Sequence, residues 1–451
     1  MSMARRKRMG QILILLSSAI SILWGFALGE TVPRGPMDFQ AIYYGSRCLM
    51  EGHNPYNLAE MESFYRAQGG EYASQPVTHR LIATMYVNMP TTFVVAAPFA
   101  VLPLAVAQAL WLLLTSSAMI LAALAMWEVG VTIAPRAALC LICLVAANCQ
   151  TIYFTGNTAG LVIGLCVVGA WCLVRNRYWQ VGVLCLAVSV ALKPHDAGLV
   201  GLYFLLAGGL QRKRALQAML VTALLGLAAL VWVSVVAPGW MQGWHANLVT
   251  ISSHGGLNDP GPDSMTGRTT SMVIDLQAAI GILCNDPRVY NWLSYLVCGA
   301  MLALWMVRTV RLRFQQSQAW LALAGVTALT MLVTYHRPYD AKLLLLAVPG
   351  CAMLCARGGR IRWVALVVTA AAMVFTGDFT LAILNILTKK CAFARTGLLA
   401  EVVAVLFTRP ASLALLAMGI FYLWVYVRRA VSDVQIDSPD VVRKTVSPVA
   451  L

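Results

Sequence analysis

Charged side chains are scarce in this chain. Only 11% of its 451 residues are charged and 60% are hydrophobic, whereas an ordinary soluble domain has about 25% charged residues. The mean hydropathy is +0.74. A soluble protein of this length needs far more charge to cover its surface. The composition therefore excludes a soluble globule and a disordered chain, and it fits a protein embedded in a lipid bilayer.

Several familiar motifs are also missing. The sequence has no nucleophile elbow, P-loop, zincin helix or Rossmann glycine pattern, so it offers no site for soluble nucleotide chemistry. It has no internal repeat and no low-complexity segment. Most of the twelve cysteines lie inside apolar runs, and no CxxC pair falls in a polar loop, which argues against a cysteine zinc site. Cys48, Cys284 and Cys391 are expected outside the membrane, where a disulfide among them stays open.

The basic residues that are present indicate membrane topology. The net charge is +15, and most of the basic residues form short clusters between apolar runs, as the positive-inside rule requires. The first cluster, 5–8, precedes an apolar run over 12–28, which predicts an uncleaved first helix with its N-terminus in the cytoplasm. The other cytoplasmic clusters are Arg175 with Arg177, Arg212 to Arg214, Arg308 with Arg311 and Arg313, Arg357 with Arg360 and Arg362, and Arg428 with Arg429.

The apolar runs predict an all-α polytopic membrane protein with about twelve spans and both ends in the cytoplasm. Residues 1–430 form one domain, and the polar tail 431–451 is expected to be disordered. The outer loops then hold most of the acidic residues, and the positive excess falls on the cytoplasmic side. The predicted spans are 12–28, 104–127, 137–153, 157–174, 179–192, 197–209, 215–237, 289–308, 318–334, 341–356, 363–382 and 410–427.

Two regions do not fit a simple pattern of spans. The run 84–102 is apolar and long enough to cross, but a crossing would reverse the side of every later basic cluster. It also contains Pro90 and Pro98. We therefore expect it to lie as a helix in the outer interface. The second region, 383–410, is assigned to no span.

The first outer loop, 30–103, contains a candidate catalytic carboxylate. The helical pattern that begins at Met37 has an apolar face (including Phe39 and Tyr43) and a polar face, which predicts an amphipathic helix on the membrane surface. The turn that begins at Gly52 ends this helix. Asp38 stands at its start. The carboxylate either caps the helix or accepts a proton at the membrane edge.

A dense group of ionisable residues follows a later span. Tyr335 to Lys342 includes His336, Arg337, Asp340 and Lys342 between two strongly apolar runs. Such a group indicates either an anion site with an orienting carboxylate or a salt-bridged turn.

Two further outer turns are candidates. Lys193, within Leu192-Lys193-Pro194-His195-Asp196, ends an apolar run, so it either meets an anion or extends its ammonium group to the interface. The uncharged turn at Gly156-Asn157 suits a tight turn, and its side chains could also bind sugar hydroxyls.

The second large outer loop, 238–288, begins with Trp240 and Trp244. We interpret these rings as interface anchors rather than as platforms for a sugar. Arg268, farther along the loop, is either a phosphate contact or a solvated side chain.

Taken in order, these segments resemble glycosyltransferase family 87. The resemblance rests on Met37-Asp38-Phe39 with Tyr43-Tyr44, the segment from Gly52 to Tyr56, Gly156-Asn157, Leu192-Lys193-Pro194 and the His336–Asp340 segment, and it covers nearly the whole chain. The glutamine usual after the Lys-Pro pair is His195 here. The family includes polyprenol-phosphate-mannose-dependent mannosyltransferases and related arabinofuranosyltransferases of cell-envelope synthesis.

The resemblance implies the C-type glycosyltransferase (GT-C) fold, with many transmembrane helices and interfacial helices in the long first outer loop. It implies that Asp38 is the general base. Lys193, Arg337 and Arg268 are then the candidate contacts of the donor phosphate, and His336 is expected to orient the acceptor or to contact the phosphate. Asp340 would hold His336 or Arg337. The expected contacts of the sugar or the acceptor also include Tyr43, Asn54, Tyr56, Asn157, His195 and Asp340.

The implied reaction is an inverting transfer, on the extracytoplasmic side of the cell membrane, from a polyprenyl-phosphate sugar to a hydroxyl of a glycolipid or glycan acceptor. Mannose is the expected sugar and arabinofuranose the alternative. No cofactor is expected, and no nucleotide-sugar DXD motif or grouped set of acidic metal ligands is present. A polytopic transporter or flippase is the rival class. Such proteins usually have repeated halves and charges near the middle of the membrane, and this sequence has neither pattern.

Overall fold

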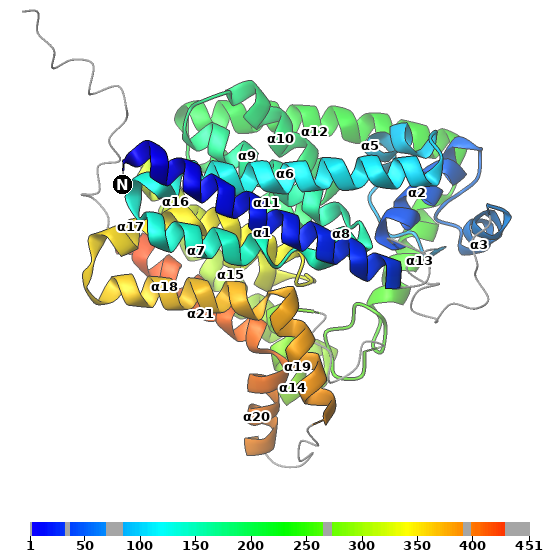
Figure 1. Ribbon diagram of the computed structural model, residues 1–451. Coiled ribbons are helices and arrows are strands. Elements are labelled where there is room, and N and C mark those ends of the chain that lie inside the picture. The colour runs from blue at the N-terminus through cyan, green and yellow to red at the C-terminus, as the bar shows by residue number, and fades with distance from the viewer. Residues whose placement is uncertain (1, 32–36, 69–83, 265–272, 391–397, 429–451) are drawn as a thin grey trace, which may run out of the picture.

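The computed structural model describes residues 2–31, 37–68, 84–264, 273–390 and 398–428, and throughout these ranges the chain forms helices and connecting turns with no strand. Helices α1, α6 and α12 run roughly parallel to one another within a bundle (Figure 1). The helices of the bundle are α1 (Met3–Thr31), α6 (Leu104–Ile133), α7 (Pro135–Ala146), α9 (Thr158–Val174), α10 (Trp179–Leu192), α11 (Pro194–Leu206), α12 (Gly209–Val236), α15 (Pro287–Arg311), α16 (Gln316–Val333), α17 (Ala347–Arg357), α18 (Gly359–Phe375) and α21 (Pro410–Val427).

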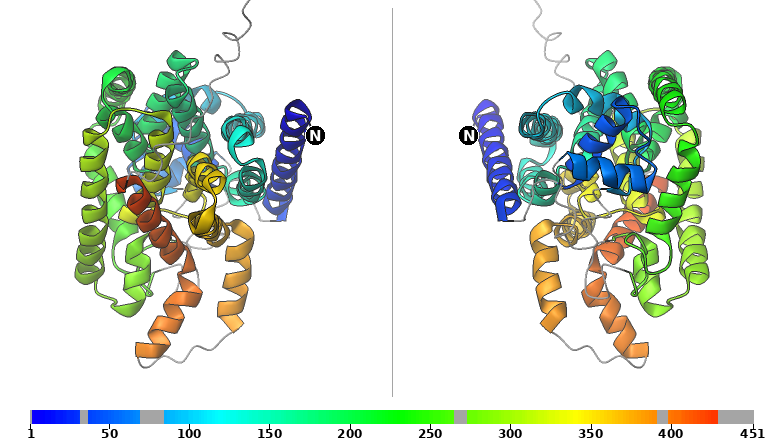
Figure 2. Two further views of the ribbon diagram at one scale, coloured as in Figure 1. Left: turned by 90° about the vertical axis from the view of Figure 1, so that its left-hand side faces the viewer. Right: turned by 90° about the vertical axis from the view of Figure 1, so that its right-hand side faces the viewer.

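The other helices lie at the end of the bundle where α1 ends, or project from the side of the bundle. In Figure 1, α2 (Met37–Met50), α3 (Leu58–Ala67), α5 (Thr91–Ala100) and α13 (Trp240–Ser252) gather at the end away from the start of α1. In Figures 1 and 2, α19 (Asp378–Lys390) and α20 (Leu398–Thr408) project from the bundle. The remaining elements are α8 (Gln150–Thr155), α14 (Leu276–Leu283) and the 3₁₀ helix η1 (Asp340–Leu346).

Helices occupy all twelve segments that the sequence predicts as spans, but fewer of them can cross a membrane alone. Within the described ranges, seven helices are long and apolar enough, or eight if the bent pair α18–α19 counts as one span. Helices such as α9, with 17 residues, and α10, with 14, are too short. At 1.5 Å per residue they reach about 25 Å or less, below the roughly 30 Å of hydrocarbon.

A bend interrupts the predicted span 363–382. Helix α18 stops at Phe375, and α19 begins at Asp378 with a bend of 66°. Gly377 lies in this bend, where a Cβ atom would come within 2.8 Å of the Asn148 side-chain oxygen. The close approach of two chain segments therefore requires glycine at the bend.

The run 84–102 contains only the ten-residue helix α5, which is too short to cross, in agreement with the prediction that this segment is no span. The first-loop helix α2 forms as predicted and ends at Met50, just before the turn at Gly52, where φ is +87°. Its position was wrong, however. Phe39 and Gln40, from the two predicted faces, are both buried, so α2 is enclosed by the protein rather than resting on a surface.

The most enclosed part of the molecule is α16 with η1 and α17. From Gln318 to Leu332 and again from Asp340 to Leu354 every side chain is buried. A helix that is apolar on all sides is stable only when it is covered on all sides. The short connection 334–339 is therefore held between two buried segments.

Of the three cysteines expected outside the membrane, Cys48 and Cys284 are free thiols. Cys391 lies outside the described residues.

Candidate functional site

A cavity of about 480 Å³ lies where α2, the start of α9, the α10–α11 junction, α13 and the 334–339 connection meet. One part of its lining is polar and charged, and the other is apolar. The polar part includes Asp38, Asn88, Asn157, Lys193, His195, Asn258, Tyr335 and Arg337, and the apolar part includes Ile42, Met85, Val87, Leu248, Ile251 and Leu257. This division suits an amphiphilic ligand with a polar head and an apolar tail.

Asp38 enters the cavity from the first turn of α2 and is held by Asn157. The Asn157 side chain donates from Nδ2 to Asp38 Oδ2 at 2.8 Å. Asn157 is also the N-cap of α9, and its Oδ1 accepts from the Ala159 N–H at 2.8 Å. Because the cap fixes the orientation of the amide, its NH₂ group must point at the carboxylate. The uncharged turn of the sequence thus positions the candidate base.

Lys193 is held by two carboxylates. It stands between α10 and α11, where Pro194 forces extended backbone on the preceding residue and so separates the two helices. Its Nζ lies 2.7 Å from Asp340 Oδ1 and 3.1 Å from Asp196 Oδ2. Burial lowers the pKa of Lys193, but the two carboxylates outweigh burial and the pKa lies above its ordinary value. The ammonium charge is therefore already compensated within the protein.

Arg337 is oriented differently. Its backbone N–H donates to Asp340 Oδ2 at 2.8 Å, while its guanidinium donates to Asn258 Oδ1 at 3.2 Å and to the Tyr335 hydroxyl. The residue is 8% exposed. Among the described residues no carboxylate lies within ion-pair distance of the guanidinium. The hydrogen-bond partners of the guanidinium are thus neutral, and the Asp38 carboxylate interacts with it electrostatically from a longer distance. Arg337 therefore brings to the cavity a positive charge that can bind an anion.

His336 lies behind the cavity lining and is fully buried. Its backbone oxygen accepts from the Ile274 N–H at 3.0 Å, and its Nδ1 lies 2.8 Å from the Thr334 carbonyl. Its Nε2 faces Asp196 Oδ1 at 3.3 Å. Burial lowers the pKa of His336, but the Asp196 carboxylate outweighs burial and the net shift is upward. The residue supports the 334–339 connection and does not line the cavity.

Four predicted contacts of the sugar or acceptor lie outside the cavity lining and have partners elsewhere. Asp340 pairs with Lys193 and accepts from the Arg337 N–H. The Tyr43 hydroxyl donates to the Leu102 carbonyl at 2.7 Å. Asn54 Oδ1 accepts from the Tyr56 N–H at 3.0 Å and closes the turn after α2. Tyr56 is 1% exposed, and its hydroxyl donates to Asn88 O. Arg268 lies outside the described residues.

The two tryptophans of the second outer loop differ in position. Trp240 is buried with its ring centroid 5.7 Å from that of Tyr56, so the prediction that it anchors the interface was wrong. Trp244 lines the cavity and donates to the Val87 carbonyl at 3.0 Å.

Sequence reasoning missed two residues that matter here. Asp196 is fully buried beside Lys193 and His336, and its signal was a carboxylate three positions after a lysine that ends an apolar helix. Asn258 binds the Arg337 guanidinium, and nothing in its sequence neighbourhood indicates this role.

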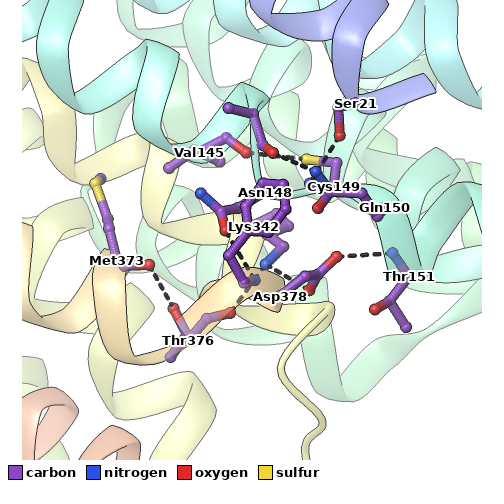
Figure 3. A network of polar contacts seen from close by, with 12 residues as sticks. Ser21, Val145, Asn148, Cys149, Gln150, Thr151, Lys342, Met373, Thr376 and Asp378 are labelled. Atoms are coloured by element: carbon purple, nitrogen blue, oxygen red, sulfur yellow. Dashed lines mark hydrogen bonds and ion pairs between the residues drawn. The ribbon is translucent and has the colours of Figure 1, made fainter. Parts of the chain in front are cut away.

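Lys342, the last residue of the predicted cluster, belongs to a separate network (Figure 3). Its Nζ donates to the Thr376 carbonyl at 2.9 Å and lies 3.4 Å from Asp378 Oδ1. Asp378 Oδ2 accepts from the Thr151 N–H at 2.7 Å. The Asn148 side-chain oxygen accepts from Phe379 N at 3.2 Å. The network connects η1 and α8 to the bend between α18 and α19. Lys342 therefore stabilises the fold and does not line the cavity.

Asp378→Ala is expected to destabilise the protein by about 3–5 kcal/mol, because it leaves the Lys342 ammonium buried without its counter-charge. The melting temperature of the detergent-solubilised protein checks this result. The double variant Lys342→Met with Asp378→Leu removes both charges together and should restore most of the loss. Equal melting temperatures for Asp378→Ala and the wild type would show that the pair does not stabilise the bend.

Comparison with known proteins agrees with the resemblance seen in the motifs. No curated protein and no solved structure matches the chain. The model of glycosyltransferase family 87 matches residues 86–334, which is more than half of the chain. The match includes Asn157 and Lys193, while Asp38 precedes it and Arg337 lies three positions beyond its end. The chain is therefore a transferase of the membrane and belongs to glycosyltransferase family 87.

Proposed function

We propose that the protein transfers a sugar from a polyprenyl-phosphate donor to a hydroxyl of a lipid-linked or envelope glycan acceptor on the extracytoplasmic side of the membrane. The observation that carries this proposal is that one cavity is lined by a carboxylate, Asp38, and by the cations Lys193 and Arg337. Mannose is the preferred sugar because of the family resemblance, and arabinofuranose is the alternative. The fold is proposed to be of the GT-C type.

The polarity of the cavity lining supports a lipid-linked donor. A polyprenyl-phosphate sugar combines a polar head, one anionic phosphate and a long apolar tail. The charged lining around Arg337 fits the head, and the apolar lining formed by Met85, Leu248 and Ile251 fits the first part of the tail. A water-soluble sugar nucleotide would leave that apolar surface without a partner.

Asp38 acts as the general base in this proposal. A hydroxyl is a poor nucleophile at neutral pH, and a carboxylate within hydrogen-bond reach takes its proton as attack proceeds. Asn157 keeps one carboxylate oxygen in place. One displacement with one base inverts the anomeric centre, as in inverting glycosidases where water is the nucleophile. The proton moves to Asp38, and the phosphate leaves with the bonding electron pair.

Arg337 stabilises the departing phosphate. Negative charge grows on the phosphate oxygens during transfer, and a guanidinium held in advance by Asn258 and Tyr335 needs no reorganisation to meet it. Lys193 lines the same cavity and adds positive potential, although Asp196 and Asp340 compensate its charge. His336 and Asp340 then act by positioning, through the 334–339 connection.

His195 and Asn157 line the cavity and are the remaining candidates for contacts with the sugar or acceptor. Tyr43, Asn54 and Tyr56 support the first loop in this proposal. Arg268 stays a candidate phosphate contact. A transporter or flippase would carry lipid without forming a product, so product formation separates the two classes.

The test uses purified full-length protein in detergent with no ion gradient. We expect it to form a glycosylated lipid from polyprenyl-phosphate mannose and an extracted lipid acceptor, and to form none from a sugar nucleotide. Polyprenyl-phosphate arabinofuranose, supplied in parallel, decides between the two sugars. Product from the sugar nucleotide alone, or no product from any polyprenyl-phosphate sugar with a full set of envelope lipids, would overturn the proposal.

A further inference from the structure

His195, Asp196 and His336 form a group behind and beside the cavity whose arrangement is not explained by the transfer reaction. One ligand atom from each residue lies within 4.8 Å of the other two. His336 Nε2 and His195 Nε2 lie 3.3 Å and 3.7 Å from the same atom, Asp196 Oδ1. Asp196 and His336 are both fully buried.

The contacts of His336 determine which of its nitrogens is available. Its Nδ1 lies 2.8 Å from the Thr334 carbonyl, so Nδ1 carries the proton and donates it. In a neutral ring, Nε2 then presents a lone pair to the Asp196 carboxylate. His336 Nε2 and Asp196 Oδ1 have no hydrogen-bond partner among the described residues, whereas Lys193 Nζ lies 3.1 Å from Asp196 Oδ2. Two electron-rich atoms at 3.3 Å without a hydrogen bond need a positive charge between them.

The two separations from Asp196 Oδ1 are close to those of a tetrahedral metal site. Bonds of about 2.0–2.1 Å from zinc to nitrogen and oxygen ligands place neighbouring ligand atoms roughly 3.3 Å apart. The two distances to Asp196 Oδ1 are 3.3 Å and 3.7 Å. The outer contacts fit as well, because a metal-bound histidine usually donates its other N–H to a carbonyl or carboxylate. The second Asp196 oxygen is occupied by Lys193 at 3.1 Å, which leaves Oδ1 for the ion.

We propose that His195, Asp196 and His336 bind a divalent transition-metal ion through His195 Nε2, Asp196 Oδ1 and His336 Nε2. Two imidazoles and one carboxylate favour zinc or cobalt over magnesium or calcium, which prefer sets of oxygen ligands. His195 lines the cavity and its side chain is 38% exposed, so it gives the ion a path of entry. Three protein ligands leave a fourth position open to the cavity. The site stands independently of the sugar or donor that the enzyme uses.

The experiment measures metal binding to the purified full-length protein in detergent. The exposed thiols Cys140 and Cys284 are first blocked with N-ethylmaleimide, and bound metal is removed with EDTA. We expect the protein to take up one Zn²⁺ per chain. Co²⁺ should bind with the visible absorption of a tetrahedral nitrogen–oxygen site, and excess Mg²⁺ should displace neither ion.

His195→Gln is the decisive variant, because its partly exposed side chain can be replaced without disturbing the core. We expect it to weaken Zn²⁺ binding by about 100-fold or more and to abolish the Co²⁺ absorption. Asp196→Asn should do the same where gel filtration shows folded protein. His254→Gln is the matched control, since His254 also lies beside a carboxylate, 3.3 Å from Asp259, but outside the group.

Unchanged affinity in His195→Gln would overturn the proposal. So would a wild-type protein that binds neither ion after the thiols are blocked, in which case a proton on His336 supplies the positive charge. Neither result bears on the choice of donor, because both are read from metal content and absorption. The metal site and the proposed transfer reaction can therefore fail separately.

Discussion

Asp38→Asn lowers the rate of sugar transfer by about 10²–10⁴-fold, the usual contribution of a positioned general base. The change is nearly isosteric, and the amide oxygen can still accept the hydrogen bond from Asn157 Nδ2, which is 2.8 Å long in the wild type. The geometry of the cavity is thus retained and only the ability to take a proton is lost. The measurement is the initial rate of product formation with saturating donor in detergent.

The control variant is Glu51→Gln. Glu51 directly follows α2 and pairs with Arg47 at 3.5 Å on the surface, so its replacement should leave the rate unchanged within about twofold, as expected of an exposed ion pair. Binding of the donor should also be retained in Asp38→Asn, because the carboxylate contacts the acceptor. A folded Asp38→Asn protein with the wild-type rate would remove Asp38 as the base.

Much of the fold follows from hydrophobic runs and basic clusters, because a membrane segment requires an apolar stretch and a charged boundary. The positions of all twelve apolar helices could be predicted in this way. The break between α18 and α19 could not be predicted in this way, since it depends on the fit of Gly377 against Asn148, which lies in the turn between α7 and α8. The burial of α2 could not be predicted from the sequence either. An amphipathic pattern shows that one face is covered, and it does not show that Gln40 on the other face is covered too.

The candidate site was predictable where charge stands at the end of an apolar run. Charges such as those of Lys193 and Arg337 must meet water, an opposite charge or a ligand. The structure brings both residues to one cavity with Asp38. Their partners depend on tertiary contacts. The hydrogen bond from Lys193 to Asp340 joins residues 147 positions apart. No local sequence pattern shows that Lys193 forms ion pairs with carboxylates whereas the Arg337 guanidinium forms none among the described residues.

Arg337→Gln therefore impairs the reaction, while Lys193→Gln impairs the fold. Removing the guanidinium takes away the cation with neutral partners, so we expect kcat/KM for the donor to fall by about 10²–10³-fold, as on loss of one preorganised donor to a developing anion. The melting temperature should stay close to that of the wild type, because Asn258 and Tyr335 lose only a hydrogen-bond donor. Arg337→Lys retains the charge without the planar fork, and should recover part of the rate.

Lys193→Gln leaves Asp196 and Asp340 buried within a few ångströms of each other with no ammonium group between them. Removing one partner of a buried ion pair costs about 3–5 kcal/mol, so the expected result is a large drop in melting temperature with less folded protein in the membrane. The two variants are compared by donor kinetics and thermal unfolding on the same preparations. If Lys193→Gln kept its stability and lost donor use, while Arg337→Gln kept donor use, the phosphate would bind at Lys193 and the assignment of the two cations would be reversed.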